Sequence, residues 1–224
     1  MNENSDLLVL TDQIVRARWS CRGFRPDPVP RPLIERLLET AQATPSWCNV
    51  QPWQVAVVSG EALDELRAAV AADERWGSDI DFPPGYDGEY AVRRRAVGWQ
   101  LYEAVGVARD DREASARQMM RNFDFFGAPH LAVISAPASL GPYGLVDCGL
   151  YVQSFLLAAQ AAGVATCAQA AVAMKSVLLR ERFGWGEDRR VVCGVSFGWP
   201  DPDHPVNSFR APRVPVADAV TFHD

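Results

Sequence analysis

A long stretch without a charged side chain, from Cys148 to Met174, constrains the fold more than any other segment of this chain. Its length would allow a membrane-spanning helix, since about 20 apolar residues cross a bilayer. However, Gln153, Gln160 and Gly163 interrupt the stretch, and the apolar pattern changes after the glycine. We therefore predict a buried helix that ends at Gly163, then a buried strand, and no membrane contact.

Elsewhere, short apolar strands alternate with helices. Strands are predicted for residues 53–58, 130–135, 164–168 and 191–197. Helices are predicted for residues 7–17, 32–43, 61–72, 89–108, 112–125, 145–162 and 173–183. Residues 79–88 and 136–144 are predicted loops, and Ser59 is a predicted cap for the helix that follows it. Because the strands are few, short and separated by helices, the fold class is α+β in layers.

Charge and cysteine content limit the partners and the compartment. The net charge is −6 and the pI is about 5.1, which argues against nucleic acid as a partner. The five cysteines are scattered, odd in number and form no CxxC pair, so we expect reduced thiols in a cytoplasmic protein. At 224 residues, the whole chain (1–224) is expected to form a single domain.

Two arginines and a serine alternate after the first predicted helix, at Arg18, Ser20 and Arg22. In an extended segment, alternate side chains share a face. Two guanidinium groups and a hydroxyl on one face would bind a phosphate through charge-assisted hydrogen bonds. From spacing alone, a solvated charged loop is an open alternative.

A second polar group precedes the first predicted strand, at Ser46, Asn49 and Gln51. The amides of asparagine and glutamine each offer a donor and an acceptor, as the edge of a flavin or a base requires. The alternative is a turn whose side chains bind the local backbone. Together, the two polar groups favour a planar ring cofactor that bears a phosphate.

Other kinds of site are disfavoured. The three histidines, His130, His204 and His223, are far apart and lack metal-ligand spacing, so no metal is expected. No Gly-x-Gly-x-x-Gly follows a predicted strand, which disfavours a Rossmann dinucleotide site. Arg210 and Arg213 lie in a proline-rich tail, where both a ligand site and an ordinary surface position are open.

Six motifs, in order along nearly the whole chain, resemble the FMN-dependent nitroreductase family and, within it, the nitrobenzoate-reductase branch. They are Arg-x-Ser-x-Arg-x-Phe (18–24), Pro-Ser-x-x-Asn-x-Gln-Pro-Trp (45–53), Arg-Asn-Phe-Asp-Phe-Phe-Gly-Ala-Pro (121–129), Asp147 with Gly149 and Gln153, Gly-Val-Ala-Thr-Cys-Ala-Gln (163–169), and Asn-Ser-Phe-Arg-Ala-Pro-Arg (207–213). Each motif is weak alone, and their order carries the resemblance.

This resemblance implies a nitroreductase-like three-layer fold, with a central mixed, mainly antiparallel sheet flanked by helices. It also implies a homodimer with two FMN sites at the interface. A C-terminal extension, residues 201–224, is then exchanged between subunits and wraps the partner. The residues implied in FMN binding are Arg18, Trp19, Ser20, Arg22, Pro45, Ser46, Trp47, Asn49, Gln51, Gln169, Ala170, Ala171, Arg210 and Arg213.

The resemblance also implies roles at the phosphate end. Arg18, Ser20 and Arg213 are expected to hold the phosphate and the ribityl chain, with Arg210 as a further candidate. Arg22 is expected near N1 and O2 of the flavin, where a fixed cation would favour the reduced, anionic form.

At the ring end, Asn49 is expected to meet the flavin edge, and the backbone around residues 169–171 to face N5 and O4. Trp47 and Phe125 are expected to contact the substrate. Two departures stand out, because Trp47 replaces the usual Gly or Ser and Ala168 replaces a frequent Pro. A large ring beside the flavin would fill the substrate cavity or stack in it, so Trp47 bears on substrate more than on cofactor.

The implied activity is that of an FMN-dependent oxidoreductase. NADH or NADPH would reduce the flavin by hydride transfer to N5, so no catalytic side chain is implied. A small electron-poor aromatic, such as a nitroaromatic or a quinone, would then replace the nicotinamide in a ping-pong cycle. Reductive dehalogenation, enone reduction or dehydrogenation on the same fold are alternatives, as is a non-enzymatic FMN-storage protein.

Overall fold

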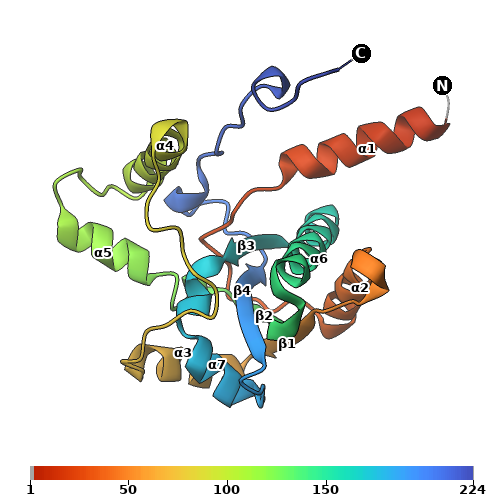
Figure 1. Cartoon of the computed structure of the whole chain (residues 1–224). Helices are drawn as coiled ribbons and strands as arrows, with labels where there is room; N and C mark the ends of the chain where they lie inside the picture. The colour runs from red at the N-terminus through yellow and green to blue at the C-terminus, as the bar shows by residue number, and fades with distance from the viewer. Residues whose placement is uncertain (1–2, 224) are drawn as a thin grey trace.

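The computed structural model describes residues 3–223, with side-chain burial described from Asp6 onward. Within these residues, helices cover both faces of one sheet (Figure 1). The helices are α1 (Glu3–Ala17), α2 (Arg31–Gln42), α3 (Glu61–Ala72), α4 (Gly88–Ala104), α5 (Arg112–Met120), α6 (Gly141–Ala161) and α7 (Ser176–Phe183). The strands are β1 (Gln54–Ser59), β2 (His130–Pro137), β3 (Ala165–Gln169) and β4 (Arg189–Gly198).

The four strands form one sheet in the order β1-β2-β4-β3, and each neighbouring pair is antiparallel. Parallel pairing is present at isolated bridges, such as the bridge between Ser20 and Thr166 beside β3. The register between β2 and β4 shifts after Ile134, which opposes Cys193, because Ser135 opposes Val191. This arrangement agrees with the expected mainly antiparallel sheet.

The strand β2 shows how the sheet separates two cores. Its side chains alternate, as strand geometry requires. Ala132 and Ile134 pack with α2 and α6, whereas Leu131 and Val133 pack with α3 and α7. The result is three layers, helices–sheet–helices, and the predicted α+β fold class is confirmed.

The uncharged stretch folds as predicted. The helix α6 runs along one face of the sheet and ends before Gly163, whose φ of 74° is readily reached by glycine. The strand β3 follows and is almost entirely buried. Among the described helices, none has the length and apolarity that a bilayer span requires.

Several element boundaries differ from the sequence predictions. α5 ends at Met120 rather than at 125, because the Asn122 side chain donates to the carbonyl of Met119 and the chain then turns. The predicted loop at 136–144 is shortened from both ends by β2 and α6. Ser59 does not cap α3. Gly60 takes that position, and the Ser59 hydroxyl pairs with His130 instead.

Part of the chain lies outside the layers. α1, α4, α5 and the C-terminal tail project away from the sheet (Figure 1). α1 and the tail carry many exposed apolar side chains in this single chain, including Leu8, Leu10, Val216 and Phe222. An exposed apolar surface of this kind is unfavourable in water and is typical of an interface.

Candidate functional site

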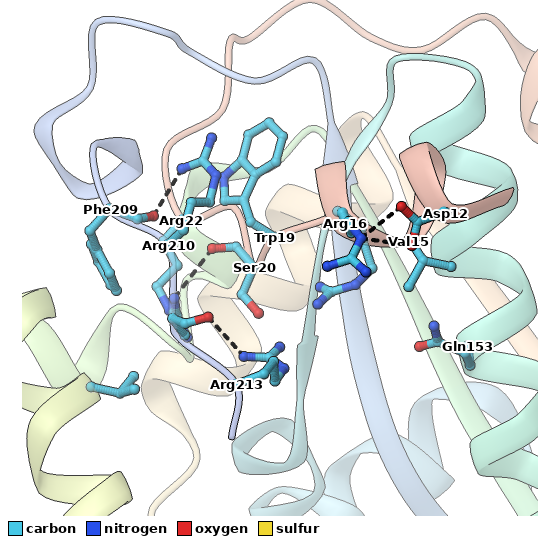
Figure 2. A pocket seen from close by; sticks show the side chains of 13 residues that line it. Asp12, Val15, Arg16, Trp19, Ser20, Arg22, Gln153, Phe209, Arg210 and Arg213 are labelled. Carbon is cyan, nitrogen blue, oxygen red and sulfur yellow. Dashed lines mark hydrogen bonds and ion pairs between the residues drawn. The ribbon is translucent and has the colours of Figure 1, made fainter. Parts of the chain in front are cut away.

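A cavity of about 840 Å³ lies between α1 and its following segment, α4, α6 and the C-terminal tail. The labelled arginines approach this space together with Ser20 and Gln153 (Figure 2). The lining residues are Asp12, Val15, Arg16, Arg18, Trp19, Ser20, Arg22, Val97, Gln153, Phe209, Arg210, Ala211 and Arg213. Cofactor sites in proteins typically occupy roughly 300–1,000 Å³.

The cavity is strongly basic. Asp12 is the one acidic residue in its lining, and Arg16 pairs with it at 2.7 Å. The half-buried guanidinium of Arg18 has no hydrogen-bond or ion-pair partner among the side chains described, residues 6–223. Burial, and next the positive charge of Arg213, lower the pKa of Arg18. A bound anion would relieve both effects, so the electrostatics favour a phosphate here.

The segment after α1 is extended because it adds to the edge of the sheet beside β3. Ser20 forms a parallel bridge with Thr166, and the backbone N–H of Cys21 donates to the Thr166 carbonyl at 2.9 Å. Extended backbone places alternate side chains on one face. Arg18, Ser20 and Arg22 accordingly all line the cavity, as their spacing predicts.

Arg22 is held by contacts on two sides. Its guanidinium donates to the Ser20 carbonyl at 3.3 Å and lies 5.8 Å from the ring centroid of Phe126. Phe126 is buried and adopts a φ of 55°, an unusual value for a bulky residue. The motif at residues 121–129 therefore contacts Arg22 but does not itself line the cavity.

The tail delivers its arginines to the cavity of its own chain. The Arg210 guanidinium lies 4.1 Å from the ring centroid of Trp19 and donates to the Phe209 carbonyl at 2.9 Å. Arg213 donates to the Ala211 carbonyl at 2.9 Å. The segment before α2 and the tail that follows β4 thus contribute arginines to the same cavity.

The predicted ring-edge turn, which contains Pro45, Ser46, Trp47, Asn49 and Gln51, does not line this cavity. Its backbone is strained, because Cys48, Asn49 and Gln51 have φ values of 50°, 56° and 46°. Strain of this kind persists only where the surroundings hold it, and it often marks functional sites. The cofactor contacts of these five residues remain predictions.

Several hydrogen bonds hold that turn in place. The Gln51 backbone N–H donates to the Ser46 hydroxyl at 2.9 Å. The Trp47 backbone N–H donates to Asp147 Oδ1 at 3.1 Å. Arg189 donates to the Pro52 carbonyl at 3.3 Å. The Gln51 side chain donates to the Asn49 carbonyl at 3.3 Å. Ser46 and Gln51 therefore bind the local backbone, the alternative left open by the sequence, while Trp47 and Asn49 are exposed.

The Gln169 side chain is committed to the protein interior. It is buried, it donates to the Asn122 carbonyl at 2.9 Å, and it accepts a hydrogen bond from Ser196. Its side chain is therefore engaged, and Gln169, Ala170 and Ala171 do not line the cavity. The expected contacts of their backbone to a cofactor remain predictions.

Phe125 is fully buried in the core on the α3 side of the sheet. The Arg67 guanidinium lies 5.9 Å from its ring centroid. In the described chain it contacts the interior rather than the cavity, so its substrate contact remains a prediction.

Several cavity residues were not predicted. Val15 and Arg16 lie within three residues of Arg18, so their proximity in sequence is a signal that could identify them. Gln153 appears in a family motif, but its role was unassigned. Nothing in the sequence of α4 distinguishes Val97, because its place depends on how α4 packs against the tail.

Other chemistries find little support in the described part of the chain. No group of three or more His, Cys, Asp or Glu side chains there could hold a metal ion. Burial raises the pKa of the Cys21 thiol to about 11 and that of Cys148 to about 12, which disfavours nucleophilic thiolates. Residues 194–198 match Gly-x-Ser-x-Gly, but Ser196 is buried within β4, unlike an exposed nucleophile.

Known proteins resemble this chain along most of its length. The model of the nitroreductase family matches residues 15–199. Nitroreductase NfnB of Mycolicibacterium smegmatis is 35% identical over 221 residues, covering 97% of this chain and 94% of that protein. A 4-nitrobenzoate reductase of a Nocardioides species is 37% identical over 222 residues, covering 94% and 89%. The crystal structure of the FMN-dependent nitroreductase NfnB from Mycobacterium smegmatis in complex with NADPH superposes with a TM-score of 0.92, at 35% identity, covering 97% of this chain and 100% of that one.

Proposed function

This chain belongs to the nitroreductase family, and on that premise we propose that it is an FMN-dependent oxidoreductase. NADH or NADPH is the electron donor, and nitroaromatic compounds or related electron-poor aromatics and quinones are the acceptors. Two relatives support this assignment by their activities, a nitroreductase and a 4-nitrobenzoate reductase. The solved relative that contains NADPH supports the donor.

The basic cavity carries this proposal. Arg18 is half-buried, without an acidic partner in the described chain, and its pKa is lowered by burial and by Arg213. Such a group is stabilised by a doubly charged phosphate, through charge-assisted hydrogen bonds. The Ser20 hydroxyl adds a neutral donor in the same lining. The cavity volume of about 840 Å³ also fits a mononucleotide better than an inorganic anion.

When bound, FMN supplies the redox chemistry, accepting a hydride from the nicotinamide and passing electrons to the acceptor. Arg18, Ser20 and Arg213 hold the phosphate and the ribityl chain. Arg22, which is in contact with Phe126, would place a fixed positive charge near the flavin ring. A preorganised cation there stabilises the negative charge that develops on reduction. Donor and acceptor use the same site in turn.

A homodimer completes the site. Trp47 and Asn49 are exposed and do not line the basic cavity of their own chain, so their proposed role is to contact the cofactor of a second subunit. Exposed apolar side chains on α1, α6 and the tail, residues 201–224, supply the dimer surface. The end of the tail wraps the partner, whereas Arg210 and Arg213 serve their own chain. The cytoplasm supplies the reducing conditions that free thiols require.

Steady-state assays on purified protein test this function. The protein should be yellow, with about one FMN per chain, and should oxidise NADH or NADPH when a nitrobenzoate or a quinone is added. Colourless protein that takes up no FMN on reconstitution would refute the cofactor assignment. Protein that binds FMN but oxidises neither nicotinamide would be a storage protein instead.

A further inference from the structure

Asn207 joins the two segments that bring arginines to the cavity. Its side chain is 7% exposed. Its Oδ1 accepts a hydrogen bond from the Arg22 backbone N–H at 3.1 Å. Its Nδ2 donates to the carbonyls of Gly23 and Asp201, both at 2.8 Å. One amide side chain thus links residues that are about 185 positions apart in the sequence.

All three contacts use the specific chemistry of an amide. Asparagine offers an acceptor and two donors in one plane, and here each is satisfied. Aspartate would retain the acceptor and lose both donors, and alanine would lose everything. Because the partners are backbone groups in a buried setting, leaving them unpaired costs more than the hydrogen bonds themselves contribute.

The two segments also approach each other closely. A Cβ on Gly23 would lie 2.4 Å from the His204 ring, so glycine is required at this position. The Gly23 carbonyl additionally accepts from the Asp201 backbone N–H at 3.1 Å. The start of the tail is therefore seated on its own chain, in a fixed position.

The positions of Arg22 and Arg210 both depend on the contacts of Asn207. The backbone of Arg22 is bound directly by the Asn207 side chain. Arg210 donates to the Asn207 carbonyl at 2.7 Å, and its guanidinium stacks on Trp19. A shift of residue 207 would therefore displace one cationic group from each segment.

We propose that Asn207 is a positioning residue of the cofactor site: it fastens the tail to the Arg22–Gly23 backbone of the same chain and so sets Arg22 and Arg210 before FMN binds. This proposal rests on the proposed function for the identity of the anion. The hydrogen bonds of Asn207 require no cofactor, so their effect can be tested in flavin-free protein.

The first test uses trypsin on the full flavin-free chain. In the parent protein, Arg210 is engaged with Asn207 and Trp19, so cleavage after Arg210 should be slow. Asn207→Ala should speed this cleavage about tenfold, the factor that corresponds to about 1.4 kcal/mol. Ser208→Ala, at an exposed neighbouring position, is the matched control and should leave the rate unchanged. Asn207→Asp serves if the alanine variant does not fold.

The second test concerns FMN. Asn207→Ala should raise the FMN dissociation constant about tenfold. It should also lower the midpoint potential of the bound flavin, the direction that we predict for Arg22→Ala. Adding Asn207→Ala to Arg22→Ala should lower the potential no further, because both changes act through one group. A residue needed merely for stability would not show this coupling.

Two results would overturn the positioning role: cleavage and FMN affinity equal to those of Ser208→Ala, or additive changes in potential in the double variant. A parent protein that binds no FMN would refute the proposed function. The cleavage comparison would still decide whether Asn207 fixes Arg210.

Discussion

The indole ring of Trp47 rests against the phenol ring of Tyr143, with centroids 4.8 Å apart and an angle of 46° between the ring planes. Both side chains are highly exposed in the single chain, at 63% and 61%. One turn further along α6, Asp147 accepts the hydrogen bond from the Trp47 backbone. The start of α6 thus contacts both the backbone and the ring of Trp47 within the predicted ring-edge turn.

Trp47→Gly should broaden acceptance toward bulky nitroaromatics, because it removes a large, rigid and exposed ring from the predicted ring-edge turn. Flavin reduction by the nicotinamide should be largely unchanged. Tyr143→Ala, which removes the support of the ring, should produce a smaller change in the same direction. The measurement is the rate of reduction of small and of bulky nitroaromatics by the parent protein and by the two variants. Equal losses in both half-reactions would instead indicate a structural role for Trp47.

Arg18→Ala should weaken FMN binding by roughly 1.5–3 kcal/mol, about 10- to 150-fold, through the loss of charge-assisted contacts to the phosphate. Arg16→Ala is the matched control, since Arg16 lines the same cavity but is 78% exposed and paired with Asp12. It should change affinity much less. Fluorescence titration of FMN measures both constants, and unchanged affinity in Arg18→Ala would remove that residue from the site.

Arg22→Ala should lower the flavin midpoint potential by about 40 mV, because a loss of about 2 kcal/mol on a two-electron couple corresponds to that shift. The sign follows from the charge, since removal of a cation disfavours the reduced, anionic flavin. Arg213→Ala, at the phosphate end, should weaken binding with little effect on potential. A potentiometric titration with no shift in FMN-loaded Arg22→Ala would contradict the role.

Stability should fall as the pH drops below about 6.5, because of His130. Burial lowers its pKa below the ordinary value of 6.5 in the folded state. Its Nε2 accepts the Val29 backbone N–H at 2.8 Å, a bond that protonation would break. Neutral His130 therefore makes its full contribution to the free energy of unfolding above pH 6.5. This contribution is lost as the pH falls through the lowered folded pKa, by at most about 1.4 kcal/mol per pH unit. Thermal unfolding of His130→Gln from pH 8 to 5 should show a shallower slope, and an identical slope would count against this origin.

Two truncations separate the roles of the tail. Removal of residues 206–224 deletes Asn207 and both tail arginines, so it should abolish both the dimer and FMN binding. Removal of residues 214–224 retains Arg210 and Arg213 but deletes the exposed Val216 and Phe222. It should weaken the dimer first, with flavin loss following from dissociation. Light scattering and flavin absorbance measure both, and a fully yellow dimer after the longer truncation would show that the tail has neither role.

Local patterns could predict much of this fold. The helix before Gly163 follows from an uncharged run and a left-handed glycine, and the shared face of Arg18, Ser20 and Arg22 follows from strand periodicity. Helix ends were less predictable, because they depend on side-chain competition such as that of Asn122 with the backbone of α5. Such contacts leave no periodic signal.

Contacts between residues far apart in the sequence determine the rest of the site. The family resemblance implies that the tail, residues 201–224, wraps a partner, and this stays a prediction. The contacts of Asn207 with the Arg22–Gly23 backbone of the same chain had no local signal in the sequence. The strained φ values at Asn49 and Gln51 were likewise hidden, because they are held by Asp147 and Arg189, residues distant in sequence. The family motifs identified these residues, but only packing shows which of them line the cavity and which bind the local backbone.

Anaerobic stopped-flow reduction of the FMN-loaded protein tests the central claim most directly. Mixing with NADH or NADPH should bleach the flavin absorbance in one turnover, and subsequent mixing with a nitrobenzoate should restore it while the acceptor is reduced. Absorbance that neither nicotinamide changes, in protein that holds FMN, would contradict the assignment as an NAD(P)H-dependent nitroaromatic reductase.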